Sequence, residues 1–238
     1  MNIGLVIAGG SGKRMAQDIP KQFINVYDKP VIIYTLENFQ RHPQIDAIEA
    51  VCLEGWQNVL KAYAKQYGIT KLKWIVSGGE TGQESIRNGI FNLEGKCSDD
   101  DIIVLHDGIR PMVDESILSD VIVTCRKYGN AVSALPYNDQ IFVIHDETTT
   151  KEYIQREKVR RVQTPQAYGF GTMLRVYKEA FRQGIGIYGS SYTNTLMVDF
   201  GETLYFAAGS EKNIKLTTKE DLELFKAYMK MEREMYHA

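Results

Sequence analysis

Strand-like and helix-like segments alternate along most of this chain, and no other feature of the sequence constrains its fold as strongly. Apolar runs typical of buried strands fall at 3–8, 45–52, 73–76, 102–105, 131–135 and 203–207, and helical apolar spacing falls at 31–40, 57–67, 84–93, 115–128 and 172–183. A final helix is expected from Lys219, with Thr218 and Asp221 as its capping box. This alternation predicts an α/β fold with a doubly wound, mostly parallel sheet that is covered on both faces.

The alternation is interrupted between residues 137 and 161. The segment "IFVIHDETTTKEYIQ" has apolar residues on either side of a polar centre at 146–151, a pattern that predicts a β-hairpin. We expect this hairpin to protrude as an arm that packs on a partner subunit or folds back on its own sheet. The chain has no internal repeat or linker, so the sequence predicts a single domain over 1–238 with an arm at about 137–161.

Charge and cysteine content favour a cytoplasmic protein. The net charge of −2 over 238 residues gives no overall basic field of the kind that binds nucleic acid. Cys52, Cys97 and Cys125 show no metal-ligand spacing and are typical of reduced thiols. No stretch reaches 18 apolar residues, and the first apolar run is too short for a signal peptide. We therefore expect neither a nucleic-acid partner nor a membrane span.

The first predicted strand leads into a loop rich in glycine and basic residues, "IAGGSGKRMAQDIPKQF". Ligands bind at the carboxyl ends of parallel strands, and glycine lets backbone N–H groups approach an anion closely. Lys13, Arg14 and Lys21 add positive charge. Arg14 stands where a Walker A motif needs Ser or Thr, and Gly12 is followed by no glycine in the spacing of a dinucleotide fingerprint. The loop therefore predicts a site for a triphosphate that undergoes attack.

Four segments occur in order between residues 8 and 218: "AGGSGKRM…PKQF", "LHDGIRP", "QTPQAY" and "NIKLTT". Together they resemble the CTP-dependent cytidylyltransferases that act on methylerythritol 4-phosphate or ribitol 5-phosphate, and the similarity covers essentially the whole chain. The resemblance implies a Rossmann-like nucleotidyltransferase fold, CTP as co-substrate, Mg²⁺ as cofactor and a homodimer joined through the hairpin arm. It also implies that the acceptor phosphate attacks the α-phosphorus of CTP, which releases pyrophosphate and forms a CDP-polyol.

The same resemblance assigns roles to individual residues. It implies that Arg14 and Lys21 stabilise the triphosphate and the transition state, and that Asp107 holds Mg²⁺. It implies nucleotide contacts for Ala8, Gly9, Gly10, Gly12, Gly79, Glu80 and Ser85, and acceptor contacts for Arg110, Arg156, Thr164 and Lys215, the cations Arg156 and Lys215 being catalytic. Such transfers depend on positioning and charge neutralisation, which fits this basic set. An acceptor phosphate is already ionised at neutral pH, so we expect His106 to be structural rather than a general base.

Several positions differ from the family pattern. Gly82 stands where the family usually has an arginine, Gln140 replaces the threonine of an Asp-Thr pair, and "SSYTNTLM" lacks an expected aspartate, leaving Tyr192 and Asn194 to bond a polyol hydroxyl. The last two differences fall near the acceptor rather than near CTP. The acceptor therefore stays open between methylerythritol 4-phosphate, ribitol 5-phosphate and a related polyol phosphate, and with it the choice between isoprenoid and wall or capsule synthesis.

Two other functions would also be compatible with a doubly wound sheet that binds a nucleotide. An NAD-dependent oxidoreductase would also have a doubly wound sheet, but the missing fingerprint and the basic loop argue against it. A non-catalytic nucleotide-binding module would have lost its cationic or metal-binding positions, and Arg14, Lys21 and Asp107 are all present.

Overall fold

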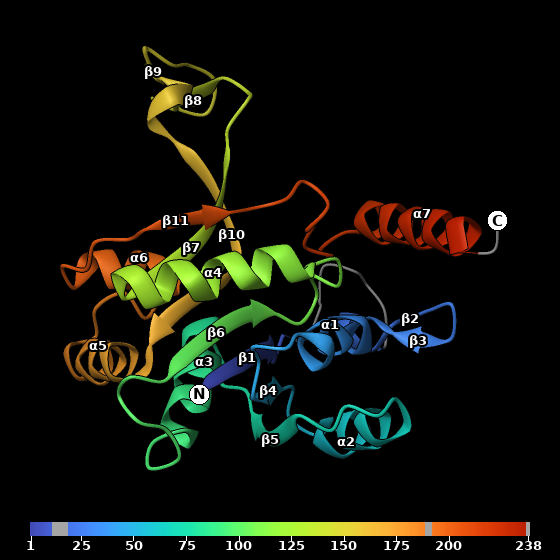
Figure 1. Ribbon diagram of the computed structural model, residues 1–238. Helices are drawn as coiled ribbons and strands as arrows, with labels where there is room; N and C mark the ends of the chain where they lie inside the picture. Colours follow the sequence, from blue (N-terminus) through green and yellow to red (C-terminus); the bar gives the residue numbers. More distant parts are fainter. Residues whose placement is uncertain (11–18, 189–191, 237–238) are drawn as a thin grey trace.

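The computed structural model describes residues 1–10, 19–188 and 192–236, which build a central seven-stranded sheet (Figure 1). The strand order is β11-β7-β10-β6-β1-β4-β5. Its strands are β1 (Asn2–Ala8), β4 (Ala47–Cys52), β5 (Leu72–Ser77), β6 (Ile102–Asp107), β7 (Asn130–Pro136), β10 (Arg160–Gly169) and β11 (Phe206–Ala208). Only β10 runs antiparallel to both of its neighbours, β6 and β7. The predicted mostly parallel sheet is confirmed.

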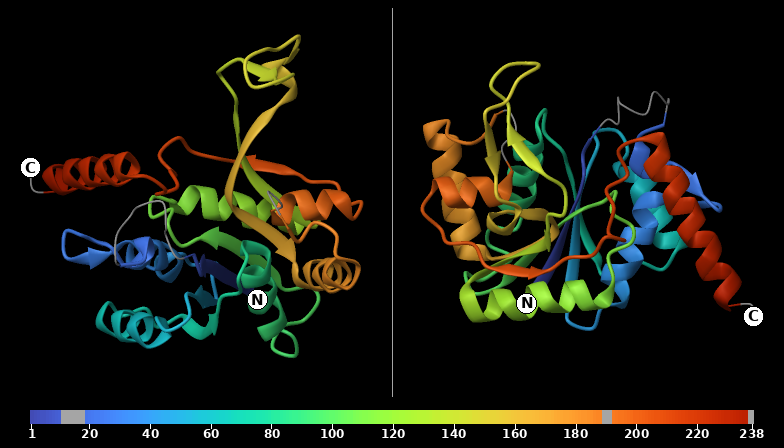
Figure 2. Two further views of the ribbon diagram at one scale, coloured as in Figure 1. Left: turned by 180° about the vertical axis from the view of Figure 1, so that it is seen from behind. Right: turned by 90° about the horizontal axis from the view of Figure 1, so that it is seen from above.

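Helices cover both faces of the sheet, as the doubly wound prediction requires (Figure 2). Apolar residues of α1 (Val31–Arg41), α2 (Gln57–Gln66) and α4 (Glu115–Tyr128) share one buried cluster. Those of α3 (Gly82–Asn92), α5 (Phe170–Gln183) and α6 (Thr193–Asp199) share the cluster on the opposite face. The final helix, α7 (Lys219–Tyr236), packs on a third cluster and begins with the predicted capping box, in which the Asp221 amide donates to Thr218 Oγ1 at 3.2 Å.

Several elements were not predicted. The long strand β10 is one of them: it contains a cis Thr164–Pro165 peptide and has a register shift against β7 between Val162 and Gln166. The helix α6 and the small hairpin of β2 (Asn25–Val26) and β3 (Lys29–Pro30) were also missed, as were the short 3₁₀ helices η2 (Lys21–Phe23) and η3 (Arg156–Lys158). Proline and clustered polar residues obscured these segments, because both are also typical of loops.

The arm is a hairpin, as predicted, and it rises from the ends of β7 and β10 (Figure 1). Its strands β8 (Ile141–Val143) and β9 (Glu152–Ile154) pair antiparallel in a two-stranded sheet of their own. The apolar side chains of Phe142, Ile144 and Tyr153 are exposed, Ile144 at 81%. The alternative in which the hairpin folds back onto its own sheet is therefore wrong.

The cysteines and the helices agree with what the sequence predicts of them. All three cysteines are free, as the sequence predicted. Within the described ranges, each helix is too short or too polar to cross a bilayer.

Glu49 is a fully buried carboxyl group on β4, on the sheet face that α3 covers. Burial raises the pKa of Glu49 from 4.5 to about 7, and the Asn92 amide and the Lys96 ammonium offset only part of this effect. Since the folded-state pKa lies above the unfolded one, folding favours the protonated form. The folded state therefore loses stability as the pH rises from about 4.5 to 7.

Replacing Glu49 with glutamine should remove this pH-dependent loss. We expect Glu49→Gln to match the wild type near pH 5 and to exceed its unfolding free energy by about 2 to 3 kcal/mol at pH 8. Urea unfolding at both pH values measures the difference, with the exposed Glu54→Gln as the control. A Glu49→Gln stability that stays level with the wild type at pH 8 would contradict the buried-charge explanation.

Candidate active site

Loops that follow β1 and β5 meet at the carboxyl edge of the sheet. A Cβ added at Gly78 would lie 3.2 Å from the Cα of Gly9, and one added at Gly9 would lie 3.0 Å from Ser85 Oγ. Ser85 Oγ accepts from the Gly79 amide at 3.0 Å and donates to the Thr81 carbonyl at 3.0 Å. A side chain at 9 or 78 would crowd these neighbours by a few tenths of an ångström, which favours glycine at both positions. The close approach brings the predicted nucleotide residues Gly9, Gly79 and Ser85 together beside Ala8.

The start of α3 closes this side of the site. Thr81 caps the helix through a capping box with Glu84, whose Oε2 accepts from the amides of Glu80 at 2.8 Å and Thr81 at 3.1 Å. The backbone amide of Glu80 is thus already engaged, while its side chain is exposed. A Cβ added at Gly82 would meet no atom within 4 Å, so packing does not impose glycine where the family usually has arginine.

Gln22 fixes the glycine loop and was missed by the sequence reasoning. It is buried, and its Nε2 donates to the carbonyls of Ala8 at 2.8 Å and Gly10 at 3.0 Å. Lys21 precedes it in η2 and is therefore held beside this loop. The only sequence signal for Gln22 was its place in the "PKQF" segment, which the resemblance already singled out. Gly12 and Arg14 lie outside the described residues, so their predicted roles are not tested.

A second group of predicted residues surrounds Asp107 at the end of β6. Lys215 Nζ donates to Asp107 Oδ1 at 3.1 Å, and Arg110 Nε and Thr164 Oγ1 donate to Oδ2 at 3.0 and 3.2 Å. The Asp107 amide in turn donates to Thr164 Oγ1 at 3.1 Å. Residues from three distant parts of the chain thus converge on one carboxylate.

The charge of Asp107 is stabilised by its neighbours. Burial alone would raise the pKa of Asp107, but the Lys215 ammonium and the Arg110 guanidinium outweigh that effect and hold the pKa well below its usual range. Opposite charges at this distance favour the ionised form. Asp107 is therefore a carboxylate at neutral pH, as binding of a cation requires.

His106 contributes to this site through a hydrogen bond from its ring to a backbone carbonyl. Its ring is fully buried, and Nε2 lies 3.1 Å from the Arg110 carbonyl, to which it donates in the neutral form. Burial lowers the pKa of His106 to about 4, so the ring is neutral near pH 7. His106 thus holds the loop that carries Arg110, in agreement with the structural role expected for it.

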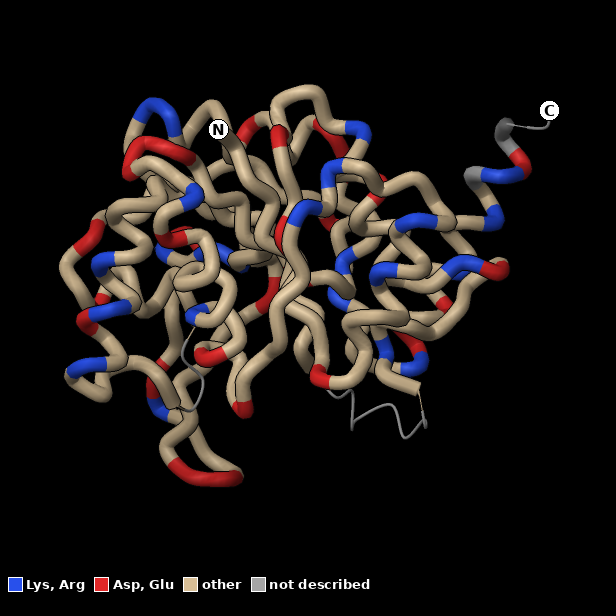
Figure 3. Tube along the Cα trace, turned by 90° about the horizontal axis from the view of Figure 1, so that it is seen from below, with Lys and Arg blue, Asp and Glu red and all other residues tan. Residues whose placement is uncertain are grey.

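Arg156 lies apart from these residues, in η3 at the base of the arm. Its side chain is exposed, its Nε is 3.2 Å from Glu157 Oε1, and with Tyr137 and Arg160 it lines a hollow of about 380 Å³. No described contact joins Arg156 to the Asp107 group. Along the Cα trace seen from below, Lys and Arg positions are interspersed with Asp and Glu positions (Figure 3). What distinguishes Lys215 and Arg110 is that both donate to the Asp107 carboxylate.

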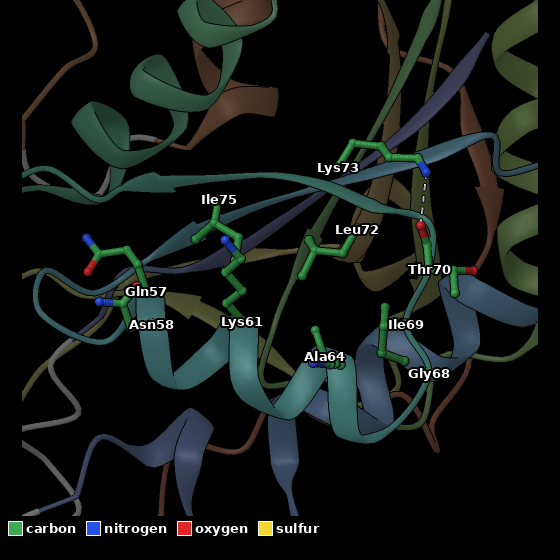
Figure 4. Close-up of a pocket in the computed structure, with 11 residues that line it drawn as sticks. Gln57, Asn58, Lys61, Ala64, Gly68, Ile69, Thr70, Leu72, Lys73 and Ile75 are labelled. Carbon is green, nitrogen blue, oxygen red and sulfur yellow. Dashed lines mark hydrogen bonds between the residues drawn. The ribbon is translucent and has the colours of Figure 1, made fainter.

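A second hollow, of about 650 Å³, lies between α2 and the edge strand β5 (Figure 4). Lys61, Lys65 and Lys73 line it together with apolar residues such as Ile75. None of the predicted site residues lines this hollow. Lys73 and the register shift between β4 and β5 are features that discourage a further strand from adding to such an edge.

Comparison with known proteins identifies the family of this chain. The family model described as IspD, 2-C-methyl-D-erythritol 4-phosphate cytidylyltransferase, matches residues 3–231. The chain belongs to the IspD family. A relative from Lacticaseibacillus paracasei named ribitol-5-phosphate cytidylyltransferase is 57% identical over 230 residues, which cover 97% of this chain and 98% of the relative. A Clostridium novyi relative named 2-C-methyl-D-erythritol 4-phosphate cytidylyltransferase is 35% identical over 231 residues, with 94% of each chain covered.

A solved structure supports the same assignment. The 4-diphosphocytidyl-2C-methyl-D-erythritol synthase from Anaerococcus prevotii superposes with a TM-score of 0.82 at 25% identity and covers 96% of each chain. This IspD-family protein is therefore a nucleotidyltransferase enzyme with the α/β fold of its relatives. Membership favours cytidylyl transfer to a polyol phosphate over the two alternatives, an oxidoreductase and a non-catalytic binding module.

Proposed function

We propose that this protein transfers CMP from CTP to D-ribitol 5-phosphate and forms CDP-ribitol and pyrophosphate. The identity of 57% to the relative named for ribitol 5-phosphate, against 35% to the one named for methylerythritol phosphate, carries this proposal. The sequence differences near the acceptor, at Gln140 and Asn194, support a site that differs from the usual family pattern there.

The proposed reaction is one displacement at phosphorus. A phosphate oxygen of the acceptor forms a bond to the α-phosphorus of CTP, the bond to the β-phosphate oxygen breaks, and pyrophosphate leaves with that electron pair. Lys21 and Arg14 would stabilise the charge that develops on the triphosphate. Lys215 and Arg110 would orient the acceptor phosphate, and the glycine loops beside Ser85 would hold the cytosine.

Mg²⁺ fits Asp107 only as an ion shared with the nucleotide. In the part of the chain that the structure describes, no three His, Cys, Asp or Glu side chains gather into a metal site. Mg²⁺ commonly takes one or two carboxylates together with substrate phosphates and water, which matches a single carboxylate at the sheet edge. Asp107 would hold the ion, which when bound neutralises phosphate charge. Lys215 is the more exposed of its cationic partners, 36% against 12% for Arg110, and is the better placed to turn toward an acceptor.

The proposed activity is tested with CTP, Mg²⁺ and a panel of polyol phosphates headed by ribitol 5-phosphate and methylerythritol 4-phosphate. Pyrophosphate release should give a kcat/KM for ribitol 5-phosphate at least ~100-fold higher than that for methylerythritol 4-phosphate. A site built to bond particular hydroxyl groups discriminates strongly against an acceptor whose hydroxyl groups do not match. CTP, and not NADH, should raise the melting temperature. A preference for methylerythritol 4-phosphate would overturn the proposed acceptor, and stabilisation by NADH alone would overturn the reaction class.

We also propose that the exposed arm joins two subunits into a homodimer. Apolar side chains such as Ile144 and Tyr153, exposed on a protruding hairpin, support this proposal. Ile144→Asp should convert a dimer into a monomer in light scattering at micromolar concentration, because it places a charge in an apolar interface. Val123→Asp, at an exposed valine on α4, is the matched control. If light scattering shows the wild type to be a monomer that keeps full activity, the proposed homodimer is wrong.

A further inference from the structure

We propose that Asn213 is a positioning residue for the transfer reaction, because it fixes the segment that presents Lys215 to Asp107 and holds Arg110 beside the same carboxylate. This inference rests on the proposed function, in which Lys215 and Arg110 orient the acceptor. Asn213 itself is fully buried and would not touch either substrate.

Two hydrogen bonds join Asn213 to different parts of the site. Its side-chain Nδ2 donates to the Thr164 carbonyl at 2.7 Å, and its backbone carbonyl accepts from Arg110 Nη1 at 2.7 Å. Thr164 and Arg110 are also the residues that donate to Asp107 Oδ2. Asn213 therefore connects the two residues that donate to Asp107 Oδ2, whereas Lys215 donates to Oδ1.

The segment around Asn213 is attached to its neighbours at both ends. The Leu216 amide donates to the Ile109 carbonyl at 2.9 Å, and Gln163 Nε2 donates to the Ser210 carbonyl at 3.1 Å. Between these attachments, the Asn213 side chain provides the bond to β10. Lys215 follows two residues later, so loss of that bond would release the backbone that sets the position of its ammonium group.

Packing alone does not explain an asparagine at this position. Asn213 Oδ1 is buried and has no hydrogen-bond partner among the described residues, which is unfavourable for a polar atom. An apolar side chain of similar shape would avoid that penalty. The donor group, which bonds Thr164, is thus the feature that asparagine supplies here.

A matched pair of variants separates positioning from general stability. Asn213→Ala should lower kcat/KM for ribitol 5-phosphate roughly 10- to 100-fold, since small displacements of orienting groups have large effects on rate. The KM for CTP should stay within about twofold, because the nucleotide loops do not depend on Asn213. The control is Asn130→Ala, also buried, whose Nδ2 donates to the Thr203 carbonyl at 2.9 Å and whose Oδ1 accepts from the Tyr205 amide at 3.1 Å. It should lower the melting temperature without lowering kcat/KM.

A double-mutant cycle tests whether Asn213 acts through Lys215. In a Lys215→Ala background, Asn213→Ala should reduce kcat/KM by less than about threefold, because the group that it positions is gone. Asn213→Leu, close in shape and without the donor, serves if the alanine variant unfolds. An undiminished effect in the Lys215→Ala background, or equal activity losses in the Asn213 and Asn130 variants, would overturn the inference. If the wild type transfers no CMP to ribitol 5-phosphate, the proposed function is wrong. If the wild type does transfer CMP to it and Asn213→Leu is equally active, only the inference about Asn213 is wrong.

Discussion

Asp107→Asn is expected to lower kcat with CTP and ribitol 5-phosphate by about 10³-fold, because the change removes a charge on which the site depends. The carboxylate is the meeting point of Lys215, Arg110 and Thr164, each of which donates a hydrogen bond to it. An asparagine has nearly the same shape but presents one acceptor instead of two, and its amide hydrogens would face donors. It would also be a much weaker Mg²⁺ ligand than a carboxylate.

Steady-state pyrophosphate release measures this effect, and the dependence of CTP binding on Mg²⁺ provides a second readout. For the variant, added Mg²⁺ should strengthen CTP binding less than it does for the wild type. Asp114→Asn is the control, because Asp114 caps α4 through the Ile117 amide at 3.0 Å and asparagine caps helices about as well as aspartate. A variant at 107 with turnover close to that of Asp114→Asn would exclude Asp107 from the reaction.

The frame of the fold was predictable because its strands are buried on both faces. The runs that became β1, β4 and β6 are almost entirely apolar, and such runs are the clearest sequence signal of a central parallel strand. By contrast, β10 contains Pro165 and runs antiparallel, so local rules favour a turn where the structure has a strand. Its position between β6 and β7 is set by tertiary packing, which a local pattern does not record.

The candidate site was predicted residue by residue, through resemblance, but its internal contacts were not. Thr164 and Lys215 reach Asp107 from 57 and 108 residues away in the chain, and no spacing rule connects such positions. Gln22 and Asn213 were missed because a buried polar side chain looks the same in a sequence as an exposed one. Only the structure shows that both side chains are buried and which groups they bond. Gln22 donates to the carbonyls of Ala8 and Gly10, and Asn213 donates to that of Thr164.

Lys21→Met should lower kcat by about 10²- to 10³-fold, because it would remove one positive charge from the site proposed for the triphosphate while keeping a side chain of similar length. The fold should tolerate the change, since the buried neighbours Gln22 and Phe23 anchor η2. The effect should fall mainly on kcat rather than on the KM for CTP, because the charge on the phosphates is redistributed most strongly in the transition state. Lys73→Met, on the edge strand β5, is the control and should leave kcat unchanged. Normal turnover by Lys21→Met would mean that the glycine-rich loop does not act on the reacting phosphates, and the location proposed for the triphosphate would have to be abandoned.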